Sequence, residues 1–280
     1  MVTQLTNSAK AFLFFGIAFA LTVSVSLLYP LLGGATLYLH MYTPTVAALL
    51  MLLVVTRDGD AWTNWQSLGL SHVGLRSWPL ALLGPLAMMS IVYGLVWSTG
   101  VADVVMVPGS TLAGVPLSFA VGLVISSALA LGEELGFRGY LLPRLLPLGT
   151  TRALLLTGLL HGLWHFPVLL LTPLLPIQGT WLIVGPIFLL TLTAAGVFYG
   201  YLQLTSGSVW PATLGHGAIN VLLNLFSGFT IASSPLALEY LAGETGVVTL
   251  AVTALAAIWL GHRLQQRRGA LATQLQHAGA

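Results

Sequence analysis

Three short clusters of polar residues stand in an otherwise apolar chain, and each combines side chains that take part in acid–base chemistry. A carboxylate beside a histidine can deprotonate a water molecule. A second histidine with an asparagine amide can donate hydrogen bonds to a developing oxyanion. Such a set suffices to hydrolyse an amide without a serine or cysteine nucleophile. The clusters are Glu133-Glu134-x-x-x-Arg138, His161-x-x-x-His165 and His216-x-x-x-Asn220.

The spacing within the first cluster separates the two carboxylates. Adjacent residues on a helix point about 100° apart. Arg138 follows Glu134 by four residues, which is the favoured acid-to-base spacing for an ion pair. We therefore predict that Glu134 pairs with Arg138 and that Glu133 remains available for chemistry. An ion-pair network with a purely structural role is the alternative interpretation.

The composition predicts the environment of these clusters. The chain has 280 residues, of which 57% are hydrophobic and 6% are charged, whereas soluble domains carry about 25% charged residues. Several apolar stretches reach the roughly 20 residues that cross a bilayer. A charged side chain near the bilayer centre is costly and marks a functional site. The absence of cysteine excludes disulfides and thiolate nucleophiles.

We therefore predict an all-α, polytopic integral membrane protein with about eight transmembrane helices around an intramembrane polar cavity. Residues 1–262 should form a single transmembrane domain, and residues 263–280 a polar, basic cytoplasmic tail that lies against anionic lipid or is disordered. The net charge of only +2 indicates no nucleic-acid partner. The predicted spans are roughly 10–32, 42–56, 79–99, 116–142, 153–173, 181–204, 209–227 and 246–262.

The distribution of positive residues predicts the orientation. Apart from Arg138, all Lys and Arg residues fall on one side of the eight-span topology, and the opposite loops contain Asp103, Glu239 and Glu244 without a Lys or Arg. Because cytoplasmic loops retain positive residues, we expect a multi-pass protein of the plasma (inner) membrane with both termini cytoplasmic. The positive residues on that side are Lys10, Arg57, Arg76, Arg144, Arg152, Arg263, Arg267 and Arg268.

The three clusters are expected at similar depth in the membrane. With a rise of 1.5 Å per residue, Glu133 lies about 14 Å and His165 about 18 Å from the cytoplasmic ends of their helices. On the same scale His216 and Asn220 lie about 10 and 16 Å deep. Since a shared site requires a common depth, the sequence predicts one polar layer in the cytoplasmic half of the membrane.

Each histidine also has a simpler interpretation. His165 could be a buried histidine with satisfied hydrogen bonds, and His216 with Asn220 could form contacts between helices, as polar residues often do in membranes. His161 shares a face with His165, and its assignment to the site or to packing stays open. No role is assigned to the remaining histidines, which are expected in loops or near membrane edges: His40, His72, His262 and His277.

In order and spacing, the three motifs resemble the CAAX protease and bacteriocin-processing family, which includes the Ras-converting CAAX endopeptidase and the Abi proteins. The resemblance implies that Glu133 with His165 activates the water and that His216 with Asn220 stabilises the oxyanion. The motifs cover residues 133–220 and are specific for the family, but not for a substrate. Two further runs are similar to prokaryotic members, Gly139-Tyr140-Leu141 and Trp164-His165-x-Pro167.

The resemblance further implies that Glu134 and Arg138 support the reacting groups. One departure concerns His161, which stands where the family usually has phenylalanine. Two imidazoles with carboxylates could bind zinc, but the chain has no His-Glu-x-x-His motif. We therefore expect metal-independent chemistry without a cofactor.

These observations predict an intramembrane endopeptidase that cuts a membrane-bound, possibly lipidated, peptide or protein near the cytoplasmic face. Three alternatives remain: a zinc-dependent form of the same protease, a non-enzymatic immunity or scaffold protein with the same fold, and a proton-coupled transporter. A transporter is disfavoured because the chain shows no obvious repeats. A rhomboid-type serine protease is disfavoured because Ser206 and Ser208 fall at the junction of two predicted spans.

Overall fold

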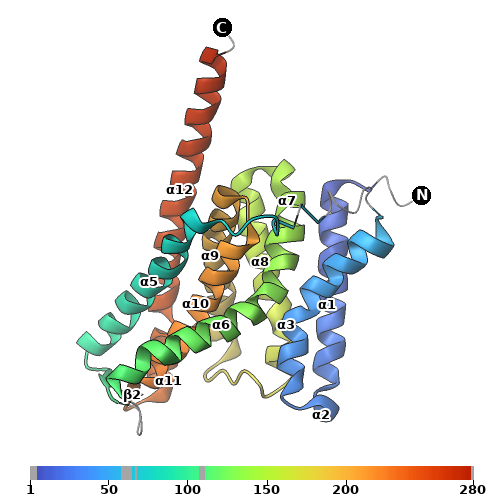
Figure 1. Cartoon of the computed structure of the whole chain (residues 1–280). Coiled ribbons are helices and arrows are strands. Elements are labelled where there is room, and N and C mark those ends of the chain that lie inside the picture. Colours follow the sequence, from blue (N-terminus) through green and yellow to red (C-terminus); the bar gives the residue numbers. More distant parts are fainter. Residues whose placement is uncertain (1–4, 58–64, 67, 107–110, 279–280) are drawn as a thin grey trace.

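The protein is an all-α polytopic membrane protein. Its computed structural model describes residues 5–57, 65–66, 68–106 and 111–278. Its long helices run up and down through one bundle, with α6 strongly tilted across the others (Figure 1). The long helices in the described part are α1 (Asn7–Leu27), α3 (Ala35–Leu50), α5 (Trp78–Ser98), α6 (Val115–Glu134), α8 (Thr150–Leu171), α9 (Trp181–Ser206), α10 (Val209–Gly228) and α12 (Val247–Ala278).

Short elements connect the long helices. Two three-residue strands pair antiparallel, with Ala102 opposite Ala232, and they join the ends of α5 and α10. The short elements are α2 (Tyr29–Leu32), the π-helix η1 (Met51–Val55), the 3₁₀ turns η2 (Leu75–Ser77), η3 (Leu112–Gly114) and η5 (Leu146–Leu148), β1 (Ala102–Val104), the π-helix η4 (Leu135–Leu141), α7 (Leu142–Leu145), β2 (Thr230–Ala232) and α11 (Pro235–Leu241).

The predicted spans agree with the long helices to within a few residues, with three exceptions. The α-helical part of the fourth span ends at Glu134, and the span continues as the π-helix η4. The second span begins at Ala35, seven residues before the predicted start at residue 42, and α12 continues as a helix to Ala278 through most of the predicted tail. Within the described residues, seven helices are long and apolar enough to cross a membrane, and α10 is not among them. The predicted count of eight spans is therefore not confirmed. Helix α10 is long enough but not apolar enough, because it carries the polar residues of the third cluster.

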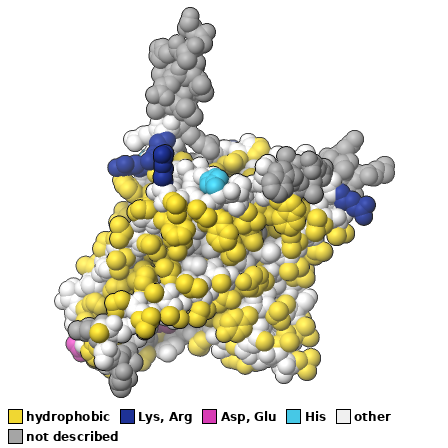
Figure 2. Space-filling model, viewed as in Figure 1, with side chains coloured by type: hydrophobic (Ala, Val, Ile, Leu, Met, Phe, Trp, Pro, Cys, Tyr) yellow, Lys and Arg dark blue, Asp and Glu magenta, His cyan; other side chains and the backbone are white. Residues whose placement is uncertain are grey.

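The outer surface matches a membrane environment. Apolar side chains cover the middle of the visible face, and Lys and Arg gather at the end where both termini lie (Figure 2). An acidic side chain is visible at the opposite end (Figure 2). The protein is thus an integral, multi-pass membrane protein whose positive residues on this face mark one end of the bundle.

Glycines let the helices of the site approach to backbone contact. A Cβ atom on Gly196 of α9 would lie 2.5 Å from the Cα atom of Gly158 on α8. A Cβ atom on Gly217 of α10 would lie 2.8 Å from the backbone nitrogen of Ser127 on α6. Small residues are favoured at such crossings because close packing replaces the hydrophobic effect between helices in lipid. These contacts fix the spacing of α6, α8, α9 and α10.

Candidate active site

The α-helix α6 ends at Glu134, immediately after the first polar cluster begins. The chain continues into the π-helix η4, which contains Arg138. Such wide turns occur often at functional sites. Helix α3 binds the backbone just before the cluster, because Thr45 Oγ1 donates to the carbonyl oxygen of Gly132 at 2.6 Å. The two carboxylates are therefore held at a junction that a second helix supports.

Arg138 organises the buried carboxylates. One guanidinium nitrogen, Nη1, donates to Oε1 of Glu134 at 2.9 Å and also lies 3.0 Å from Nδ1 of His161. Neither Arg138 nor Glu134 is accessible to solvent. The predicted pairing of Glu134 with Arg138 is thus present, and Arg138 in addition links the first motif to the second.

The guanidinium also determines which ring nitrogen of His161 carries the proton. A guanidinium has only donors, so Nδ1 of His161 must accept and carries no proton. The proton is then on Nε2, which donates to Oε2 of Glu133 at 2.7 Å. This chain of hydrogen bonds orients the Glu133 carboxylate and leaves its other oxygen, Oε1, available as a base.

His165 lies beside Glu133, with which the resemblance pairs it for water activation. The direct hydrogen bond to Glu133 comes from His161, one turn earlier on α8. His165 is half-buried, and its Nδ1 donates to the carbonyl oxygen of His161 at 3.1 Å. In the neutral ring Nε2 therefore carries the lone pair. The ligand atoms of Glu133, His161 and His165 all lie within 4.8 Å of one another, so His165 stays beside the carboxylate.

His216 approaches the carboxylates from α10. Its Nδ1 donates to Oε1 of Glu134 at 2.8 Å, and its ring stacks on Tyr199 of α9 with the centroids 4.9 Å apart. The Arg138 guanidinium lies 4.9 Å from the centroid of the same tyrosine ring. If His216 is charged, it and the Arg138 guanidinium together balance the negative charges of the two carboxylates. Buried charges need such partners.

Asn220 lies one helical turn after His216 and is half-buried. Its carbonyl oxygen accepts a hydrogen bond from Nδ2 of Asn224 at 2.8 Å. The four-residue spacing places Asn220 on the same face of α10 as His216, but no hydrogen bond joins its side chain to the other site residues among those described. Asn224 is exposed, and its bond stays within the helix.

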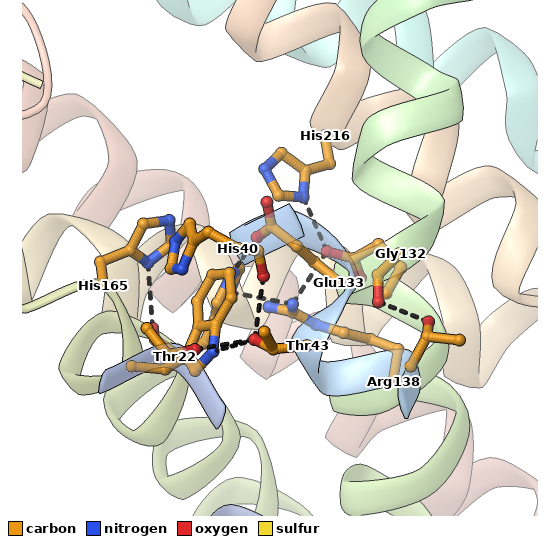
Figure 3. A network of polar contacts seen from close by, with 12 residues as sticks. Thr22, His40, Thr43, Gly132, Glu133, Arg138, His165 and His216 are labelled. Carbon is orange, nitrogen blue, oxygen red and sulfur yellow. Dashed lines mark hydrogen bonds and ion pairs between the residues drawn. The ribbon is translucent and has the colours of Figure 1, made fainter. Parts of the chain in front are cut away.

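His40, which has no role assigned from the sequence, is buried beside the site. It is 1% exposed, and its ring stacks on Trp164 at 3.8 Å between centroids. Its ring also meets His165 edge to face at 5.6 Å (Figure 3). The expected position near a membrane edge followed from the predicted start of the second span at residue 42. Because α3 begins at Ala35, His40 lies inside the bundle.

Several polar atoms at the site have no hydrogen-bond partner in the described part of the protein. Among the described residues, Oε2 of Glu134 and both Nε and Nη2 of Arg138 are buried without a protein hydrogen-bond partner. Buried polar groups of this kind are normally satisfied by ordered water. The arrangement therefore suits a hydrated site within the membrane rather than a dry ion pair.

One group of described side chains is close enough together to hold a metal ion. It consists of Glu133, His161 and His165. A metal-bound histidine normally donates its second ring N–H to an acceptor. His165 has this arrangement, but Nδ1 of His161 accepts from Arg138. His161 therefore does not fit a ligand role while that contact is present.

The serines considered for a rhomboid-type protease serve to connect helix ends. Ser208 caps α10 by accepting from the backbone nitrogen of Trp210 and donates to the carbonyl oxygen of His72. Ser206 donates to the carbonyl oxygen of Leu202. These hydroxyl groups have structural partners, away from the carboxylate cluster.

Comparison with known proteins identifies the segment that carries the cluster. The family model described as type II CAAX prenyl endopeptidase Rce1-like matches residues 113–222, which run from before α6 to Leu222 of α10. No curated protein matches the chain. All six residues predicted for the site fall inside the matched segment, and the resemblance that their motifs indicate is confirmed. Over residues 113–222 this chain thus matches the Rce1-like family of type II CAAX prenyl endopeptidases.

Proposed function

We propose that the protein is an intramembrane endopeptidase that hydrolyses a peptide bond of a membrane-associated or lipidated substrate near the cytoplasmic face. The family match supports a CAAX-type intramembrane protease in general. The observation that carries the finer proposal is the chain of hydrogen bonds from Arg138 through His161 to Glu133, which leaves one carboxylate oxygen as a base.

The proposed nucleophile is a water molecule bound between Glu133 and His165. Oε1 of Glu133 and Nε2 of His165 are both acceptors, so one water could donate a hydrogen bond to each. Its lone pair would then point away from both groups, toward the substrate carbonyl carbon. Glu133 takes one proton as the water oxygen attacks, which is general base catalysis.

The attack converts the substrate carbonyl into a tetrahedral oxyanion. Nε2–H of a charged His216 and the amide of Asn220 are the proposed donors to that oxygen, and preorganised donors of this type supply a large part of catalysis. Collapse of the intermediate breaks the carbon–nitrogen bond. The proton held by Glu133 passes to the leaving amine, so the carboxylate is regenerated.

The remaining residues hold this arrangement in place. Glu134 fixes His216 through the 2.8 Å contact to Nδ1, and Arg138 fixes both Glu134 and His161. His161, whose role the spacing leaves open, holds Glu133 through the direct hydrogen bond to Oε2. His165 is assigned to the water, as the resemblance implies.

Replacement of His165 by alanine tests the assignment. We expect His165→Ala to insert and fold normally but to lose cleavage, because the water loses one of its two acceptors. The measurement is mass spectrometry of the products from membrane-bound peptides, lipidated and unlipidated, with the purified protein in nanodiscs. The matched control is His262→Ala, at an exposed position of α12. Full activity of His165→Ala would refute the mechanism.

A zinc-dependent form of the protease is the second candidate, favoured by the 4.8 Å grouping of Glu133, His161 and His165. Because His161 accepts from Arg138, we expect cleavage to survive prolonged treatment with a chelator. Metal content of the purified protein should be measured beside activity. Loss of cleavage on chelation, restored by zinc alone, would favour the zinc-dependent form.

A further inference from the structure

His40 lies against the proposed site but outside the segment that matches the family. It comes from α3, whereas the match begins at residue 113. Its ring is nearly parallel to Trp164, with an interplanar angle of 10° at 3.8 Å, and meets His165 at 69° and 5.6 Å. The imidazole is thus held between the indole and the half-buried histidine of the site. Figure 3 shows His40 beside His165.

Both ring nitrogens of His40 are buried and have no hydrogen-bond partner among the described residues. A neutral imidazole always presents one N–H donor and one acceptor. Burying such groups without partners is unfavourable, and a packing role alone would be better served by an aromatic hydrocarbon ring. The position of His40 therefore requires a polar molecule that the protein itself does not supply.

The surroundings of His40 show that its backbone and stacking partner are fixed by other bonds. Thr43 Oγ1 donates to the carbonyl oxygen of His40 at 2.9 Å. The same oxygen atom of Thr43 accepts from Nε1 of Trp164 at 3.0 Å and contacts Oγ1 of Thr22 at 2.7 Å. This network connects α1, α3 and α8 and uses the backbone of His40, but it leaves the imidazole nitrogens free.

We propose that His40 binds the water molecule of the site together with His165. In this arrangement the N–H of His40 donates to the water oxygen, and the water donates to Nε2 of His165 and to Glu133. These three hydrogen bonds fix the orientation of the water and leave one lone pair for attack. The inference rests on the proposed function for its consequence in catalysis, but water binding by His40 can be observed separately.

Substitution by phenylalanine removes the nitrogens of His40 and preserves the ring. We expect His40→Phe to keep the stacking on Trp164 and to have an unchanged or higher thermal stability, because an apolar ring of similar shape replaces a buried polar ring that has no hydrogen-bond partner in the described part of the protein. The kcat for peptide cleavage should fall by about 100-fold, the effect of a misplaced reacting group, with little change in KM. His40→Gln, which retains an N–H donor, should recover part of kcat. His262→Phe, at an exposed site, is the matched control.

A second measurement separates this inference from the proposed function. Nitrogen-15 NMR of labelled histidines in the intact protein reports the hydrogen bonds of His165, assigned by comparison with His165→Ala. A shift of the Nε2 signal of His165 in His40→Phe is expected, even if no peptide tested is cleaved. An unchanged His165 spectrum, or full kcat in His40→Phe, overturns the inference. Absence of cleavage by the wild-type protein together with the expected NMR shift contradicts only the proposed function.

Discussion

Replacing Glu133 by glutamine should lower kcat for peptide cleavage by about 1,000-fold or more, within the range of general acid–base catalysis. The amide oxygen of glutamine can still accept from Nε2 of His161, so the 2.7 Å contact can be kept. The amide cannot take a proton from water. The substitution therefore removes the base while it preserves the volume and the neighbouring hydrogen bond.

The measurement is a full kinetic analysis in nanodiscs, with thermal unfolding recorded on the same sample. Glu133→Gln should unfold within a few degrees of the wild-type protein. Asp103→Asn, an acidic-to-amide change at an exposed position of β1, should retain full activity. If Glu133→Gln cleaved peptides at the wild-type rate, Glu133 would not be the base, and the carboxylate would have to be assigned a structural role.

Arg138→Met should have the largest effect on stability. Removing one partner of a buried ion pair costs about 3–5 kcal/mol, because the remaining charge is left unpaired. Here Glu134 would lose its guanidinium and His161 would lose the donor that determines its protonated nitrogen. We expect a clear fall in the unfolding temperature and loss of cleavage together.

A double substitution distinguishes the charge effect from a packing effect. Arg138→Met combined with Glu134→Gln removes both charges and should recover part of the lost stability, although cleavage should remain absent. Arg152→Met, which removes an exposed positive charge at the start of α8, is the control and should unfold like the wild-type protein. Equal stability of Arg138→Met and Arg152→Met would contradict the argument.

The sequence predicts local relationships well when they lie within one helix. The pairing of Glu134 with Arg138 follows from four-residue spacing alone and is present at 2.9 Å. The apolar stretches likewise predict the long helices closely. These features depend on helical periodicity and on the length of the bilayer, both of which can be read along the chain without knowing how the helices pack.

Relationships between helices were predicted less accurately. His161 and His165 share one face of α8, so spacing cannot say which ring reaches Glu133. The choice depends on how α8 is rotated and shifted against η4, which the spacing along one helix does not contain. His40 was missed for a similar reason, since the boundary of the second span differed by seven residues. A polar residue at the edge of an apolar stretch gives no signal of its own.

The glycine crossings have a consequence for how a peptide is admitted. Where main chain rests on main chain, as between Gly158 and Gly196, rotation of side chains cannot widen the gap between two helices. A helical substrate is about 10 Å across with its side chains, and its amides are shielded by their own hydrogen bonds. A helical peptide therefore cannot pass between α8 and α9 at this crossing, and a substrate of the proposed protease has to reach the carboxylates from another side of the bundle.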